Sequence, residues 1–338
     1  MHLAQGADRN TMKAVILAAG EGSRMRPLTY TTPKPLLAVA GKPTLEWILE
    51  AVRPHVDGVM LIVGHLRKKI EAHFGTQWNG IAVTYVHQVE QRGTGHALQM
   101  CRDALQGETR LFVIYGDNIP APGDVARCAE HDLAALAVRV PDPEKYGIFK
   151  TDDAGYLIDL IEKPKTHVGN LANAGVYVFD QRIFEEIDNL KESERGEIEL
   201  TDAVLSLAKR APMKVVDVEE HWLPIGVRDD IAKAEPVLLG RPRGPEEFLA
   251  QRRQSLAGLL GMWWQSDNAA MKEQEREALL AFVNGASAAQ LDRVTAVTLG
   301  EEKPVYLTTE EMIFALASQR GWQAPLADAL RNLLKESV

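Results

Sequence analysis

Residues 17–37 read LAAGEGSRMRPLTYTTPKPLL and follow directly on the short apolar run MKAVI at 12–16. An apolar strand that leads into a glycine-rich turn presents backbone N–H groups that can surround phosphate oxygens. Glu21 is the one acidic residue between positions 12 and 44, whereas the whole chain has a net charge of −9. This contrast predicts a pocket for a polyanion rather than a solvated surface. The basic residues around the turn are Lys13, Arg24, Arg26, Lys34 and Lys42.

The two common phosphate-binding glycine motifs do not fit this turn. The dinucleotide motif requires a third glycine where Met25 stands, and the Walker motif requires one at Leu36. A Rossmann-type dehydrogenase is therefore disfavoured. Pro33 and Pro35 flank Lys34, and we expect them to hold this lysine in an extended segment.

Outward from the turn, strand-like apolar runs alternate with helical patterns as far as about residue 235. This alternation predicts an α/β fold, with a Rossmann-like mixed, mostly parallel sheet flanked by helices. A hairpin that turns at 152–155 and a further strand at 174–180 indicate a lobe that covers the substrate. The expected strands are 12–18, 58–63, 81–86, 111–115 and 134–140, and the expected helices are 44–52, 93–105 and 123–131.

A second boundary falls at 240–247, where GRPRGPEE interrupts the pattern with two prolines and two glycines. Beyond it, apolar residues recur at helical spacing. We expect one domain at 12–238 and an all-helical C-terminal domain of unknown role at 245–338. Trp263 and Trp264 either belong to the core of that domain or form an interface between copies of the chain, so a homo-oligomer through the C-terminal helices is one expectation.

Composition excludes several classes of protein. Two cysteines in 338 residues argue against a disulfide scaffold and against a four-cysteine zinc site. The first ten residues lack the apolar stretch of a signal peptide, and no apolar run approaches the roughly 20 residues that cross a bilayer. We expect a soluble cytoplasmic protein that binds neither membranes nor nucleic acid.

The turn and its neighbours resemble the signature of sugar-1-phosphate nucleotidylyltransferases. LAAGEGSRM, PLT, PKPLL and GKP stand in the order of that family, and the resemblance extends over residues 12–235. It implies a substrate pair of a nucleoside triphosphate and a sugar 1-phosphate. By the same resemblance, Arg24 stabilises the triphosphate charge during transfer and Lys34 contacts the sugar phosphate. The nucleotide is held by the loop residues Leu17, Ala18, Ala19, Gly20 and Gly22.

The segment HQVEQRGTGHALQ at 87–99 resembles the base-recognition segment of bacterial N-acetylglucosamine-1-phosphate uridylyltransferases. The resemblance implies that Gln88, Gly93 and Thr94 read uracil, and an amide can match the donor and acceptor on the edge of a pyrimidine. Alternatively, Thr94 caps a helix and His96 lies on its surface. UTP is the favoured nucleotide, with dTTP next, and the sugar is N-acetylglucosamine 1-phosphate or glucose 1-phosphate.

Asp117 in YGDN ends an apolar run, a position where ligands bind in open α/β sheets. An oxygen ligand there suits Mg²⁺, and the family uses this aspartate as a metal ligand. PEKYGIF, IEKPK and NAGVY imply that the sugar and its phosphate are held by Gly147, Glu162, Lys163 and Asn173. EIELTDAV at 197–204 matches a helix start in these enzymes, where Thr201 would be the N-cap.

One departure concerns the second metal ligand. The family has a carboxylate two residues after a tryptophan, and this chain has Pro224 there, in HWLPIGVRDD. Asp229 is the candidate replacement, and Asp230 and Asp217 are alternatives. A further alternative is that a single carboxylate binds Mg²⁺ and that phosphates complete its shell. The departure leaves a second hypothesis beside the enzyme with UTP, a catalytically weakened or inactive sensor of nucleotide or sugar phosphate. A GDP-mannose-type pyrophosphorylase is a further alternative.

Overall fold

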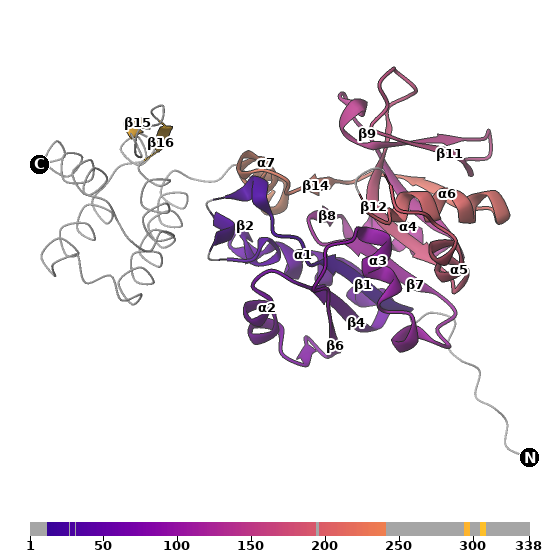
Figure 1. Ribbon diagram of the computed structural model, residues 1–338, viewed down its shortest axis with the longest axis horizontal. Coiled ribbons are helices and arrows are strands. Elements are labelled where there is room, and N and C mark those ends of the chain that lie inside the picture. The colour runs from indigo at the N-terminus through magenta and orange to yellow at the C-terminus, as the bar shows by residue number, and fades with distance from the viewer. Residues whose placement is uncertain are drawn as a thin grey trace, which may run out of the picture. The chain divides into compact units, whose positions relative to one another are not determined.

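The computed structural model describes residues 12–26, 28–30, 32–193 and 196–240, together with the strands at 294–297 and 305–308. The chain divides into two compact units, and the first comprises Met1–Met25 and Thr32–Val237. This first unit contains the site described below. A mixed β-sheet forms its centre (Figure 1).

Parallel strands occupy the middle of the sheet, in the order β7-β1-β4-β6. Their apolar side chains are almost all buried, because helices cover both faces of a parallel sheet. The carboxyl ends of these strands therefore meet at one edge, where the loops that follow them come together. The bounds are Met12–Ala18 for β1, Val56–Val63 for β4, Ile81–His87 for β6 and Leu111–Tyr115 for β7, and β5 (Gln77–Trp78) adds an antiparallel edge to β6.

The other half of the sheet is antiparallel and is organised by the long strand β12. β12 pairs with β7 on one side, and both β9 and β10 pair with it on the other, so the sheet divides there. The expected hairpin is confirmed, with β10 and β11 joined through residues 152–155. The bounds are Ala134–Arg139 for β9, Gly147–Thr151 for β10, Leu157–Glu162 for β11, Leu171–Phe179 for β12 and Lys214–Asp217 for β13, which runs parallel to β9.

Helices cover the sheet on both faces. α3, α5 and α6 pack on one another and on the core that contains Val15, Tyr177 and Phe184. α1 and α4 form a separate group and pack on each other. The expected α/β architecture is thus confirmed in the first unit. The helices are α1 (Thr44–Val52), α2 (Arg67–Phe74), α3 (Thr94–Gln99), α4 (Pro122–Ala129), α5 (Arg182–Asp188), α6 (Leu200–Arg210) and α7 (Arg228–Leu239).

Two small strand pairs flank the carboxyl edge of the sheet. The pair β8 and β14 places Pro224 opposite Asn118, next to the end of β7. The pair β2 and β3 follows the short 3-10 helix that begins at Lys34. The two strand pairs therefore hold in place the chain directly after Asp117 and directly after the 3-10 helix of Lys34. The bounds are Ala38–Val39 for β2, Lys42–Pro43 for β3, Asn118–Pro120 for β8 and Trp222–Pro224 for β14.

Three expectations about helices need correction. The helix expected at 93–105 ends at Gln99 and resumes as a 3-10 turn at Asp103–Leu105. α6 has Glu199 as its N-cap, and Thr201 lies inside the helix and is buried. The C-terminal region is not wholly helical, because the β-branched segments β15 (Val294–Val297) and β16 (Val305–Thr308) pair antiparallel. The other helices expected at 245–338 lie outside the described residues, and across the described part no helix is long and apolar enough to span a bilayer.

Candidate functional site

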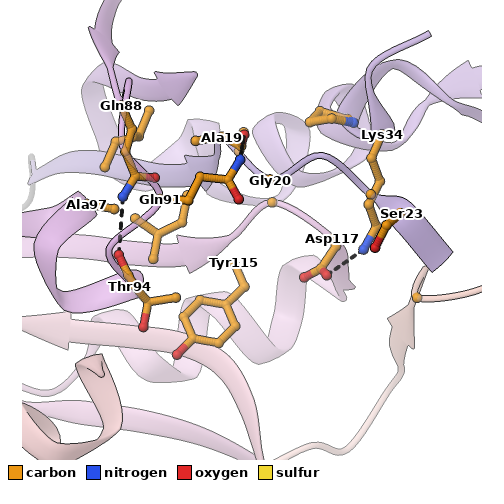
Figure 2. Close-up of a pocket in the computed structure, with 18 of the residues that line it drawn as sticks. Ala19, Gly20, Ser23, Lys34, Gln88, Gln91, Thr94, Ala97, Tyr115 and Asp117 are labelled. Carbon is orange, nitrogen blue, oxygen red and sulfur yellow. Dashed lines mark hydrogen bonds and ion pairs between the residues drawn. The ribbon is translucent and has the colours of Figure 1, made fainter. Parts of the chain in front are cut away.

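A cavity of about 380 Å³ lies at the carboxyl edge of the parallel strands. Figure 2 shows Lys34 and Asp117 at one end of this cavity and Gln88 and Thr94 at the other. The cavity therefore brings together the loops after β1, β6 and β7. Its lining includes all the residues that the sequence linked to nucleotide and catalysis: Leu17, Ala18, Ala19, Gly20, Gly22, Arg24, Lys34, Gln88, Gly93, Thr94 and Asp117.

The loop after β1 is held by its neighbours. The carbonyl of Ala19 accepts hydrogen bonds from the backbone N–H of His65 (3.3 Å) and from Nε2 of Gln91 (3.2 Å). A Cβ on Gly64 would lie 2.6 Å from this carbonyl oxygen, so the approach requires glycine. Gly22 has φ +64°, where glycine is favoured, and its carbonyl accepts from the N–H of Met25. The loop is thus preorganised at the cavity wall.

Lys34 and Asp117 form an ion pair inside the cavity. Nζ of Lys34 lies 2.6 Å from Oδ2 of Asp117, and the two side chains are 11% and 36% exposed. The expectation that the two prolines hold Lys34 in an extended segment is wrong, because only Pro33 is extended (φ −61°, ψ 142°) and Lys34 begins a 3-10 helix. The pair joins the PKP segment to the loop after β7, so it sets a positive and a negative group side by side in the cavity wall.

Two of the basic residues around the turn serve other purposes. Lys13 pairs with Asp57 at 2.7 Å on the neighbouring strand. Lys42 pairs with Glu50 and lies 3.4 Å from the ring centroid of Trp47. The expectation that all five cations surround a polyanion pocket is therefore wrong for these two, and Arg26 does not line the cavity either. Arg24 and Lys34 line the cavity.

The segment between β6 and α3 forms the far end of the cavity. Gln88 is buried, and its Nε2 donates to the carbonyl of Gly93 at 3.2 Å. Gly93 is the N-cap of α3, with φ +98°, so Thr94 does not cap its own helix. Instead, Oγ1 of Thr94 accepts from the N–H of Leu200 at the start of α6 (3.0 Å). Gln88, Gly93 and Thr94 thus form one end of the cavity wall.

A second cluster contains the four residues linked to the sugar, and these do not line the cavity. Gly147 lies opposite Glu162 in the β10–β11 ladder, and a Cβ on Gly147 would lie 2.9 Å from Oε2 of Glu162 and 3.9 Å from Cβ of Asn173. Lys163 has φ +44°, and its N–H donates to the carbonyl of Tyr146. The structure therefore brings Gly147, Glu162 and Asn173 together.

Tyr115 connects this cluster with the cavity. Nδ2 of Asn173 donates to the hydroxyl of buried Tyr177, whose ring centroid lies 6.0 Å from that of Tyr115. Tyr115 lines the cavity and lies beside Thr94 (Figure 2). Burial raises the pKa of Tyr115 to about 12, and the charges of Glu162 and Glu199 add to the increase. A neutral phenol thus joins the two groups of residues.

The structure offers one carboxylate, Asp117, at the metal position that the sequence predicts. Pro224 lies beside it in β14, and the N–H of the next residue, Ile225, donates to the carbonyl of Asp117 (2.8 Å). Asp229 is exposed and does not line the cavity. Oδ2 of Asp230 accepts from the N–H groups of Gly226 and Val227, both at 2.9 Å. Among the described residues, no three His, Cys, Asp or Glu side chains form a ready-made metal site.

Sequence reasoning missed several lining residues. Gln91, Tyr115, Glu197, Glu199 and Gly226 contribute to the cavity but were not singled out. Tyr115 could have been found, because it stands directly before the Gly-Asp pair that ends the strand. The two glutamates lie in a segment that the sequence assigns to a helix start, so no local pattern distinguished them.

The sequence profile described as nucleotidyl transferase matches residues 13–240. The chain belongs to the nucleotidyl transferase family. In this nucleotidyl transferase the matched range covers every cavity residue named above, and it ends one residue after α7.

Relatives and solved structures agree with this family. The chain is 38% identical over 230 residues to the protein named Bifunctional protein GlmU of Methanocaldococcus jannaschii. The aligned region covers 68% of this chain and 55% of that protein. It therefore spans about half the length of such relatives. It is 34% identical to the UTP–glucose-1-phosphate uridylyltransferase AglF of Haloferax volcanii, over 66% of this chain and 95% of that one. A crystal structure from Bacillus anthracis named for a glucose-1-phosphate thymidylyltransferase aligns with a TM-score of 0.61 at 30% identity, covering 69% and 98% of the two chains.

Proposed function

We propose that this protein transfers a nucleotidyl group from a nucleoside triphosphate to a sugar 1-phosphate, releasing pyrophosphate. The observation that carries the proposal is the Lys34–Asp117 pair at 2.6 Å in a cavity bounded by the glycine loop. These two residues are 83 positions apart, and they meet beside backbone N–H groups at the end of a parallel strand. Such an arrangement suits phosphoryl oxygens better than any apolar ligand.

The reaction needs positioning and charge stabilisation more than proton transfer. A phosphate oxygen of the sugar 1-phosphate forms a bond to the α-phosphorus, the bond from that phosphorus to the bridging oxygen breaks, and pyrophosphate leaves with the electron pair. The nucleophile is already anionic at neutral pH, so no general base is required. Arg24 is proposed to offset the charge that builds on the triphosphate, and Lys34 and Lys163 are proposed to contact the sugar phosphate.

A divalent cation is part of the proposal. The lining side chains carry three carboxylates against two cations, so a triphosphate bound here requires added positive charge. Mg²⁺ is commonly bound through one or two carboxylates together with substrate phosphates, and Asp117 fits that donor set. Mg²⁺ would neutralise and align the phosphate oxygens. Asp117 would hold it, and Asp229 is the candidate for a second carboxylate that experiment must test.

The proposed substrates are UTP first and dTTP next, with N-acetylglucosamine 1-phosphate or glucose 1-phosphate as acceptor. The buried amide of Gln88 supports a pyrimidine, because its Nε2 already contacts the carbonyl of Gly93 and Nδ1 of His96, and its Oε1 can accept from the N–H of the base. The names of the relatives support the acceptors, since they include a glucose-1-phosphate uridylyltransferase. Gly147, Glu162 and Asn173 are proposed to hold the sugar.

The test is Mg²⁺-dependent pyrophosphate release over a grid of UTP, dTTP, GTP, CTP and ATP against several hexose 1-phosphates. Asp117→Ala and Asp229→Ala are assayed beside the wild type. Turnover of one pair that Asp117→Ala abolishes supports the proposal, and loss in Asp229→Ala would assign the second ligand to α7. A preference for GTP with mannose 1-phosphate would instead support a GDP-mannose-type pyrophosphorylase.

Pro224 favours a second candidate function, a nucleotide or sugar-phosphate sensor on the same fold. It lies in β14 directly beside Asp117, and its side chain has no oxygen for a metal. A sensor would bind UTP in a calorimetric titration yet release no pyrophosphate with any pair. Restoring a carboxylate with Pro224→Asp would then be expected to raise turnover.

We propose a second domain at 245–338 that mediates self-association, in a protein of the cytoplasm. Cys101 and Cys128 are both free and buried, which is consistent with a reducing compartment. Light scattering on the full chain and on a version ending at residue 240 would show whether self-association depends on the C-terminal residues.

A further inference from the structure

One wall of the cavity is acidic and is not used by the chemistry proposed above. Glu197 and Glu199 both line the cavity and are half-buried. Ile198, which stands between them, packs its side chain against the hydrophobic core. Side chains alternate along an extended backbone, and Glu199 is extended with φ −87° and ψ 128°. Both carboxylates therefore project away from the core and into the cavity.

This acidic wall is held by the loop that is proposed to read the base. The N–H of Gly95 donates to the carbonyl of Ile198, and the N–H of Ile198 donates to the carbonyl of Arg92, each at 2.8 Å. A Cβ on Gly93 would lie 2.5 Å from the carbonyl oxygen of Ile198, so the two backbones are in direct contact. The position of Glu199 is thus set by rigid backbone, and its carboxylate does not cap its own helix α6.

The charged groups divide the cavity into two ends. Lys34 pairs with Asp117 at one end, where the phosphates are proposed to bind. Next to Glu199, the N–H of Leu200 donates to Oγ1 of Thr94, which lies beside Tyr115 (Figure 2). The ring of Tyr115 is in contact with Gly175, two residues after Asn173 of the cluster proposed to hold the sugar, because a Cβ on Gly175 would lie 2.7 Å from this ring. Glu199 therefore lies on the side of the cavity that faces this cluster. An ionised carboxylate only accepts hydrogen bonds, and it repels another carboxylate.

We propose that Glu199 is a specificity-determining residue that accepts a hydrogen bond from a ring hydroxyl of the sugar 1-phosphate and rejects sugars that bear a carboxylate. The inference rests on the proposed function and narrows its substrate class. Neutral and amino hexose 1-phosphates present hydroxyl or ammonium donors to Glu199. Uronic acid 1-phosphates place a second negative charge against the acidic wall and are excluded.

The experiment compares the wild type with Glu199→Gln and with Glu130→Gln, a matched control at the exposed C-cap of α4 outside the cavity. kcat/KM is measured for glucose, glucosamine and glucuronic acid 1-phosphates at saturating nucleotide. We expect Glu199→Gln to lower kcat/KM for glucose 1-phosphate by about tenfold and to raise it for glucuronic acid 1-phosphate. The Kd for nucleotide alone and the Tm stay at the wild-type values, and Glu130→Gln matches the wild type throughout.

Other outcomes are equally decisive. An unchanged preference for glucose over glucuronic acid, or a loss confined to nucleotide affinity, overturns the proposal. If glutamine lowers the Tm, Glu199→Ser provides a second uncharged variant with a favourable N-cap residue. If the wild type turns over no pair, the proposed function fails. Calorimetric titration with the same sugar 1-phosphates then tests Glu199 on its own, and equal affinities in wild type and variant would overturn the proposed role.

Discussion

The Lys34→Met substitution tests two roles of this lysine. One is the proposed contact with a phosphate oxygen of the substrate, and the other is the ion pair with Asp117. Methionine keeps an unbranched side chain of similar length and removes the ammonium group, which lies 2.6 Å from Asp117. A hydrogen bond to a charged group is worth about 1.5–3 kcal/mol. Losing one such contact with a phosphate oxygen should therefore lower kcat/KM for nucleotidyl transfer by roughly 10- to 150-fold.

The same substitution should act in the opposite direction on divalent cations. Without Lys34, the carboxylate of Asp117 has lost its cationic partner, so the protein without nucleotide should bind Mn²⁺ more tightly in a calorimetric titration. Lys42→Met is the matched control, because Lys42 pairs with Glu50 outside the cavity. The reasoning is refuted if Lys34→Met retains kcat/KM within twofold, or if its affinity for Mn²⁺ falls along with its activity.

Gly175→Ala should lower both Tm and turnover, because Gly175 has φ +73° and a Cβ would lie 2.7 Å from the ring of Tyr115. Gly196→Ala isolates the backbone strain, since its φ is +72° with no atom within 4 Å, and an equal loss of Tm in both variants would argue against the clash. Burial raises the pKa of Tyr115 from 10.0 to about 12. Its contribution to stability is therefore complete below about pH 10 and is lost as the pH rises toward 12. Urea denaturation between pH 9 and 12 should show a shallower decline for Tyr115→Phe, and identical slopes would contradict the shift.

The parallel centre of the fold was predictable because its signals are local. Each central strand is a short apolar run, and each run ends at glycine or a polar residue. The glycine loop, Gln88 and Asp117 follow such runs directly, so the shared carboxyl edge of the sheet brings them into one cavity. The antiparallel half was predicted less completely, since the sequence indicated the hairpin but not the division of the sheet at β12.

The partners of charged side chains were not predictable in this way. Lys13, Lys34 and Lys42 belong to the same basic stretch, yet they pair with Asp57, Asp117 and Glu50 on three different elements. A count of local charge cannot show which direction a side chain takes, because that depends on strand order and on the burial of its neighbours. The correction for Lys13 and Lys42 has this origin.

The sequence by itself determined the family, the glycine loop and most residues of the cavity, because these depend on motifs and on strand ends. The tertiary structure decided that Glu197 and Glu199 face the cavity, since their direction follows from the burial of Ile198 and from its contact with Gly93 and Gly95. It also decided that Tyr115 joins the cavity to Asn173 through Tyr177. Each of these arrangements requires contacts between segments that are far apart in the chain, and such contacts exist only once the sheet has formed.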